Sequence, residues 1–532
     1  MRKSKKIGII FSVAITSLFL IYILIVFYSR YDILVNEVPS IPCANYDQDR
    51  RIIIIVHECT LSEVDNIIDN DNILRKETSG DIWLLNSSIL VSEGALLTIE
   101  ATEAKWIKIN SEGKSIISME PVTSGSFNES SPHFIQVFGR IDLLGVKITS
   151  WDPSRNNYTF QKPDGSVPRP YITVSSGAGP SRLEYSEVAY LGFNSSRKQG
   201  LSFYGGDFSS LKGNKIHDLW YGFFSTNVGH LVLESNTVFD NKRYGVDPHL
   251  HSHDMVVRGN HIYNSRIGLI CSLECSNILF EGNRLENNQE VGLMLSRKAT
   301  NSTVKFNNIS SSNVGLAISE SHGNAVTQNS ITKSNIGLSV TNNSTRNILT
   351  NNSITDPPQC GIRISLGAKN NTVQSNFIEG FDKSGICVGI GGELNSFKSN
   401  EIEGFGLYGI DVKDRAKENI FRDNSIHLAN HAIRVYNNND TLFINNKIGN
   451  TFGHQYLIAG NATLNLEDTR FIGDTIRSAG ESVNIARISH SGIIDVTTKR
   501  VGQAGFETSR YDSDFEPYVA NMTSETLKLY SK

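Results

Sequence analysis

The chain has 532 residues, a formal net charge of −4 and 20 % charged residues, so no overall positive charge favours binding to nucleic acid. Glycine is frequent, with 43 residues, proline is scarce, with 13, and asparagine recurs with Ile or Val two places on. This composition excludes a mainly helical protein and predicts many short strands joined by tight turns.

An uncharged apolar run of 21 residues, from Ile7 to Phe27, follows a basic stretch at residues 2–6. Such a run is long enough to span a bilayer as a helix, and its basic flank is expected to stay in the cytoplasm. A cleavable signal peptide is the alternative, but the end of the run offers no small-residue cleavage site. We therefore expect residues 1–30 to form a cytoplasmic tip and a single-pass anchor in the cell membrane, with all later residues on the extracytoplasmic side.

Two further features agree with export. Cys43 and Cys59 flank a predicted hairpin and are candidates for a disulfide bond in an oxidising compartment. Acceptor motifs for N-glycosylation are frequent, although a repeat rich in Asn, Ser and Thr also produces them by chance. These motifs begin at Asn86, Asn128, Asn157, Asn194, Asn301, Asn343, Asn439, Asn461 and Asn521.

From about residue 210 the sequence repeats with a period of 22 to 24 residues. Each unit contains an asparagine followed two places later by Ile, Val or Leu, and a glycine further on that opens an apolar strand. Alternating runs such as Gly361-Ile-Arg-Ile predict strands whose alternate side chains share one face. The repeated asparagines are Asn214, Asn236, Asn260, Asn283, Asn307, Asn329, Asn352, Asn376, Asn400, Asn424 and Asn446.

This repeat predicts an all-β fold, a right-handed parallel β-helix in which identical asparagines pair from coil to coil. Leucine-rich repeats have a similar period, but their frame of leucines is absent. We expect a small N-terminal cap at 31–79, with a short helix around Leu61–Ile68, and the β-helix at 80–450. A β-rich C-terminal cap and tail are expected at 451–532.

One coil, at residues 244–254, concentrates ionisable side chains, namely Tyr244, Asp247, His249, His251, His253 and Asp254. In the other coils the first and third residues after the glycine are apolar and point inward, so the second and fourth point outward. The outward pair in this coil is therefore Asp247 and His249, about 7 Å apart along the strand on one solvent face. The neighbouring coils place Phe224 and Ser272 beside this pair.

An outward histidine next to an aspartate on a rigid strand suits general acid–base catalysis. Pro248 occupies a core-facing position where its missing N–H costs a ladder hydrogen bond, and this favours a functional interpretation of the pair. Tyr244, at the strand entry, is either a catalytic partner or a packing aromatic. A metal site formed by His249, His251 and His253 would require the strand to continue past His249. We expect the chain to bend there, and we predict no metal.

Three motifs stand in successive coils of the repeat, namely Trp220-Tyr-Gly-Phe-Phe, Asn236-Thr-Val-Phe-Asp-Asn and Tyr244-Gly-Val-Asp-Pro-His. They resemble the central coils of the alginate-type mannuronan C5-epimerases of periplasmic bacterial type. The resemblance covers residues 80–450, and the last motif is its most specific part. The generic repeat is shared with carbohydrate-binding β-helices and with the periplasmic copper-delivery proteins of nitrous oxide reductase maturation.

The resemblance implies inversion at C5 of a uronic acid residue within a polysaccharide. The C5 proton is acidic because it lies α to the carboxyl group, so the site must neutralise that carboxylate, remove the proton from one face and return one to the other. The resemblance implies His249 as the base, Tyr244 or a water at the opposite face, and Asp247 as the orienting group. It implies no organic cofactor.

The group that neutralises the substrate carboxylate departs from the pattern of the family. The family has an arginine after a serine in the next coil, where this chain reads Ser272-Leu273. One coil later Ser296-Arg297 has the same local pattern, about 10 Å from His249 by coil spacing. Arg297 is therefore the candidate, with Arg243 as a further source of local positive charge.

Three functions remain open from the sequence. The first is a C5-epimerase acting on a mannuronan-like polysaccharide, and the second is a β-eliminating polysaccharide lyase, which begins with the same proton abstraction. The third is a non-catalytic β-helix that binds glycan or copper. In each case we expect a monomer that contacts the membrane through its N-terminal helix, and the first two predict an acidic polysaccharide as the partner.

Overall fold

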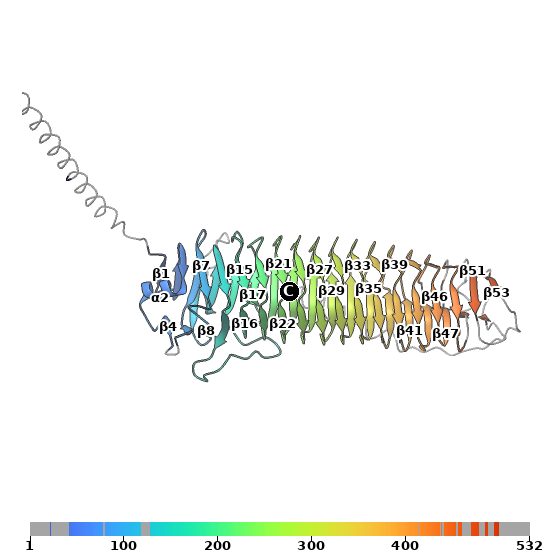
Figure 1. Cartoon of the computed structure of the whole chain (residues 1–532), viewed down its shortest axis with the longest axis horizontal. Helices are drawn as coiled ribbons and strands as arrows, with labels where there is room; N and C mark the ends of the chain where they lie inside the picture. The colour runs from blue at the N-terminus through green and yellow to red at the C-terminus, as the bar shows by residue number, and fades with distance from the viewer. Residues whose placement is uncertain are drawn as a thin grey trace, which may run out of the picture.

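The computed structural model describes residues 42–453 with gaps at 78–79, 119–127, 414, 437 and 439–440, as well as Tyr22 and the strand backbones 456–459, 470–477, 485–487 and 494–498. Within this part the chain is a right-handed parallel β-helix whose coils stack along one long axis (Figure 1). Its strands form an 18-stranded sheet, sheet A, and a 33-stranded sheet, sheet B, with one separate two-stranded pair. The predicted all-β solenoid is confirmed.

The first strands and the N-terminal helix pack directly onto the solenoid. Strand β2 (Ile52–Ile55) pairs in parallel with β6 (Ser88–Val91), so the first coil begins within the range predicted for a cap. Helix α2 (Leu61–Ile68) forms as predicted, because the Thr60 hydroxyl accepts from the Glu63 N–H while the Glu63 carboxylate accepts from the Thr60 N–H. The predicted Cys43–Cys59 disulfide is present, with its Cα atoms 5.7 Å apart.

Buried asparagines stack along the turns and hold the coils in register. The backbone N–H and the Nδ2 of Asn283, for example, both donate to Oδ1 of Asn307 at 2.9 Å. The predicted ladder is therefore confirmed, and each rung satisfies polar groups that lie away from water. A second ladder, which was not predicted, runs parallel to the first through Asn324, Asn347, Asn371, Asn395 and Asn419.

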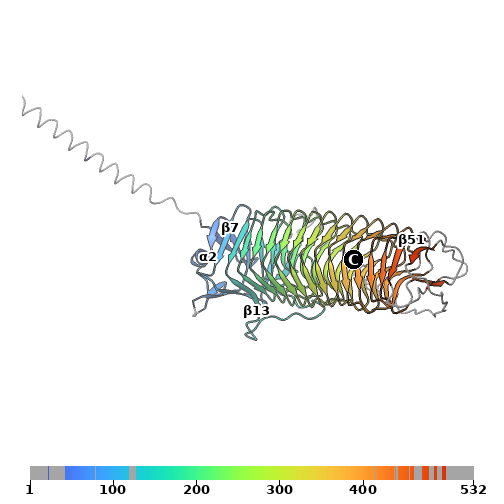
Figure 2. The ribbon, with the colours of Figure 1, turned by 45° about the vertical axis from the view of Figure 1, so that its right-hand side comes forward.

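Four successive strands of sheet A carry the coil with the ionisable side chains and its neighbours. They are β20 (Tyr221–Thr226), β23 (Tyr244–His249), β26 (Ile267–Ser272) and β29 (Val291–Ser296). The register pairs Phe224 with Asp247, as predicted. Pairing of β23 with β26 reaches only Val246, because Pro248 has no N–H to donate to the ladder. Figure 2 shows how the strands of successive coils lie side by side along the axis.

A long loop, residues 152–170, connects β13 (Lys147–Trp151) to β14 (Tyr171–Val174) and projects from the side of the solenoid (Figures 1 and 2). Part of this loop returns to cover Trp220, the residue before β20. A Cβ added to Gly165 would lie 2.7 Å from Cζ3 of Trp220, so only glycine allows this close approach. The loop thereby buries Trp220 to 4 % exposure beside the strand entries of sheet A.

None of the helices in the described part of the chain is long and apolar enough to cross a membrane. The apolar run predicted as an anchor, residues 7–27, lies outside the described residues apart from Tyr22. Much of the predicted C-terminal cap, 451–532, also lies outside them; β50 (Tyr456–Ala459) continues sheet A.

Candidate active site

Three of the predicted site residues surround the imidazole of His249, itself a predicted site residue, at the end of β23. Nδ1 of His249 lies 2.7 Å from the Ser272 hydroxyl and 3.5 Å from Oδ1 of Asp247. The Phe224 ring lies 5.2 Å from the imidazole, centroid to centroid. Only 12 % of the His249 side chain is exposed. The imidazole is therefore held on three sides and reaches solvent at one edge.

Asp247 is fully buried, which corrects the expectation that it shares a solvent face with His249. Its carboxylate is covered because sheet A carries large apolar side chains on this face, with Phe224 at 6 % and Ile270 at 3 % exposure. Neither carboxylate oxygen has a hydrogen-bond partner among the described residues. A buried carboxylate without hydrogen bonds destabilises a fold, so its position next to an imidazole makes it a candidate functional residue.

The position of Asp247 also selects which nitrogen of His249 carries the proton. A carboxylate only accepts hydrogen bonds, so an Oδ1 atom 3.5 Å from Nδ1 favours the tautomer with the proton on Nδ1. Nδ1 then donates to the Ser272 hydroxyl. Nε2 is left with a lone pair, and it can accept a proton from a substrate.

Aromatic side chains form a continuous wall on the upstream side of His249. The Tyr221 ring lies 4.9 Å from Tyr244 and 5.7 Å from Phe224, and Tyr204 lies 5.8 Å from Phe224. Burial raises the pKa of Tyr204 to about 12, so its phenol stays protonated at neutral pH. Tyr244 is 3 % exposed and packs in an outer apolar cluster with Ile267, next to this aromatic wall.

Arginines lie on both sides of the pair along the solenoid axis. The guanidinium of Arg243 lies 5.8 Å from the Tyr244 ring and 5.9 Å from Trp220. Arg297 follows β29, two coils beyond His249, with a left-handed φ of 50°. Arg197, which the sequence analysis missed because it lies in a turn outside the regular repeat, is exposed and stands 5.2 Å from the Tyr204 ring.

The structure does not bring His249, His251 and His253 together. The chain turns after His249, and His251 has a left-handed φ of 58°. His251 faces Glu274, with Nδ1 3.5 Å from Oε2, whereas His253 pairs with Asp254. The alternative metal site of the sequence analysis is therefore wrong as a set of three, because the strand does not continue.

Two disulfide bonds were not predicted, and one of them lies beside the site. Cys271–Cys275 closes the turn that follows Ser272, with its Cα atoms 6.0 Å apart. The residues between include Leu273 and Glu274, both in the left-handed region. Cys360–Cys387 links two coils further along, so all six cysteines of the chain are paired.

Fold and site together define a right-handed parallel β-helix with an imidazole and a buried carboxylate on the outer face of one sheet. Two family models match the chain: "Periplasmic copper-binding protein (NosD)" at residues 183–359 and "Right handed beta helix region" at residues 372–516.

The curated relatives are mannuronan C5-epimerases, which confirms the resemblance drawn from the motifs. The protein from Pseudomonas syringae pv. tomato is 25 % identical over 264 residues, which cover 47 % of this chain and 45 % of that one. The protein from Pseudomonas aeruginosa is 26 % identical over 222 residues, 39 % of this chain and 37 % of that one. The chain thus spans less than half the length of these relatives. A crystal structure of the periplasmic alginate epimerase AlgG has the same fold, with a TM-score of 0.52 and 17 % identity over 81 % of this chain and 87 % of that one.

Proposed function

We propose that this chain is a C5-epimerase that acts on uronic acid residues of a mannuronan-like polysaccharide. The observation that carries the proposal is the orientation of His249. Its Nδ1 is held by Ser272 at 2.7 Å and faces the buried carboxylate of Asp247 at 3.5 Å, which leaves Nε2 as a base at the accessible edge. The similarity to mannuronan C5-epimerases supports the same reaction.

In this reaction Nε2 of His249 takes the proton from C5, and the electron pair of the broken C–H bond moves into the substrate carboxyl group. A proton delivered to the opposite face of C5 then restores the carbon with inverted configuration. Asp247 stabilises the imidazolium that forms, because its carboxylate is close and shielded from water. Tyr244 or a water molecule supplies the second proton.

Negative charge that develops on the substrate carboxyl group requires a cation. Arg197 precedes β17 (Gly200–Phe203), two coils before His249, and Arg297 follows β29, two coils after it. Two coil spacings separate each of them from the coil of His249 by about 10 Å along the axis. This placement supports binding of an acidic polymer along the solenoid axis, with Arg297 and Arg243 as the predicted contacts to carboxylates.

An extracytoplasmic location is supported by the three disulfide bonds, which form and persist in oxidising compartments. The single-pass anchor, a monomeric state and glycosylation of the acceptor motifs stay predictions.

Incubation with polymannuronate in deuterated water tests the proposal. The wild-type chain is expected to place deuterium at C5 with inverted configuration, detected by proton NMR, and the variant His249→Ala is expected to lose this exchange. His251→Ala is the matched control, since His251 is 53 % exposed and faces Glu274 instead of the site. Unsaturated sugar ends, seen by their ultraviolet absorbance, would assign the chain to the lyases. Exchange that survives in His249→Ala would refute the assignment of the base.

A further inference from the structure

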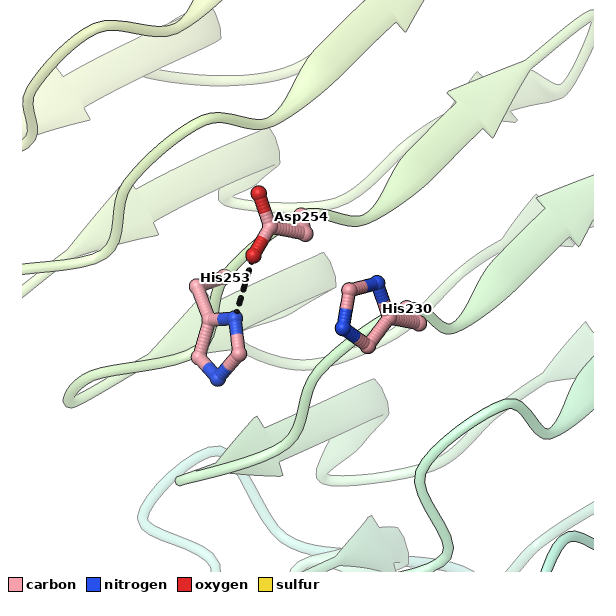
Figure 3. Close-up of side chains that lie close together, drawn as sticks. All are labelled: His230, His253 and Asp254. Carbon is pink, nitrogen blue, oxygen red and sulfur yellow. Dashed lines mark hydrogen bonds and ion pairs between the residues drawn. The ribbon is translucent and has the colours of Figure 1, made fainter.

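A second group of ionisable side chains lies at the turns that follow the strands of the candidate active site. His230 belongs to the turn after β20, and His253 and Asp254 belong to the turn after β23, one coil further on. The backbone joins the two turns, since the N–H of His230 donates to the carbonyl of His253 at 3.2 Å. Figure 3 shows the three side chains directed toward one another.

The geometry of this group suits coordination of one ion. One nitrogen from each histidine and one carboxylate oxygen of Asp254 all lie within 4.8 Å of one another. Nδ1 of His253 is 2.7 Å from Oδ2 of Asp254, and the two imidazole rings are 5.7 Å apart at 85°. Metal–ligand bonds of about 2.0–2.2 Å would require small side-chain rotations that bring the more distant of these atoms closer together.

Two neighbouring residues fix the rings before any ion binds. The imidazole of His230 stacks on Phe208, with ring centroids 4.6 Å apart and planes 10° from parallel. The imidazole of His253 occupies the space above Gly229, where an added Cβ would lie 2.6 Å from its Cε1 atom. His230 and Asp254 both adopt the left-handed conformation, with φ of 59° and 52°. In the next three coils asparagine and glycine occupy this turn position, at Asn277, Asn301 and Gly323.

We propose that His230, His253 and Asp254 bind a divalent transition-metal ion such as Zn²⁺ or Cu²⁺. Two imidazole nitrogens and one carboxylate oxygen are a ligand set that such ions accept, and exposure of the group leaves the remaining coordination positions to water. Binding displaces the proton shared between Nδ1 of His253 and Asp254 into solvent. The ion would link two adjacent coils, and this site is independent of the proposed epimerase activity.

Calorimetric titration of the full-length, metal-free protein with Zn²⁺ tests the site. We expect one ion per chain, and a loss of affinity of about tenfold to a hundredfold or more in either His230→Ala or His253→Ala, since removal of even an outer partner of a ligand typically costs that much. Gly229→Ala is expected to weaken binding as well, because the new methyl group displaces the His253 ring. Titration with Cu²⁺ adds an independent readout, in which electron paramagnetic resonance should show two coordinating imidazole nitrogens in the wild-type chain.

His251→Ala is the matched control, because His251 lies on the same turn but faces Glu274. It should bind Zn²⁺ like the wild-type chain and should keep the same Cu²⁺ spectrum. The proposal is overturned if the wild-type chain takes up no stoichiometric ion, if His230→Ala keeps full affinity, or if His251→Ala loses as much affinity as His253→Ala. Because every variant is outside the proposed catalytic group, C5 exchange by the same proteins reports separately on the proposed function.

Discussion

Replacement of Asp247 by asparagine removes one charge from the candidate active site with almost no change in side-chain volume. The carboxylate lies 3.5 Å from Nδ1 of His249 and is fully buried. At this distance, with an effective dielectric constant of about 20, its attraction to a protonated imidazole is about 5 kcal/mol. If the imidazolium forms during proton abstraction, loss of this attraction corresponds to between about three and four orders of magnitude in rate.

The full effect is an upper bound, because residual solvent and relaxation reduce it, and we expect kcat of Asp247→Asn to fall about 10²–10³-fold. KM should change little, since a fully buried carboxylate does not reach the polymer. Initial rates of C5 exchange over a range of polymannuronate concentrations separate these two constants. Asp254→Asn is the control, because its carboxylate is 40 % exposed and outside the proposed catalytic group. A kcat for Asp247→Asn within about threefold of the wild type would show that the charge does not act on the imidazole, because threefold is less than 1 kcal/mol.

Two further predictions concern stability. Asn307→Ala leaves the buried N–H and Nδ2 of Asn283 without their shared acceptor, so the free energy of unfolding, measured in urea, is expected to fall by about 2–6 kcal/mol. The control is Asn308→Ala at the exposed neighbouring position, which should lower the free energy of unfolding far less. Burial lowers the pKa of His133 to about 4, below its ordinary value of 6.5, so the unfolded chain binds a proton first as the pH falls. The free energy of unfolding of the N-terminal coils should therefore be highest above pH 6.5 and decrease by up to about 3 kcal/mol toward pH 4. Equal unfolding midpoints for the wild type and His133→Asn across this range would show that His133 is not the cause of the decrease.

The repeat could be predicted from the sequence because each coil repeats the same local requirement. The repeated asparagines at the turns and the repeated glycines at the strand starts specify the register between coils. The register in turn identifies the neighbours of Asp247 and His249. Burial of Asp247 could not be predicted in this way. It depends on how far the side chains of Phe224 and Ile270 extend over the outer face. Alternation along a strand specifies the face to which a side chain points, but it does not specify whether neighbouring side chains cover it.

The disulfides and the second histidine cluster show the same limit. Cys387 is the second residue after a strand glycine, so the frame places it on the outer face, whereas Cys360 directly precedes its glycine and alternation does not place it there. The pairing of His253 with His230 depends instead on the turn after β23, where the alternating pattern has ended.

Because each coil contacts only its neighbours, the number of coils can change without a change in the residues of the candidate active site. The residues proposed for the reaction lie between the turn before β17 and the turn after β29, whereas the asparagine ladder continues for several coils beyond them. Insertion or deletion of one 22- to 24-residue unit downstream would shift the far end by about 4.8 Å and leave the imidazole and its partners in place. Chains of this fold can therefore differ in length while they retain the same candidate active site.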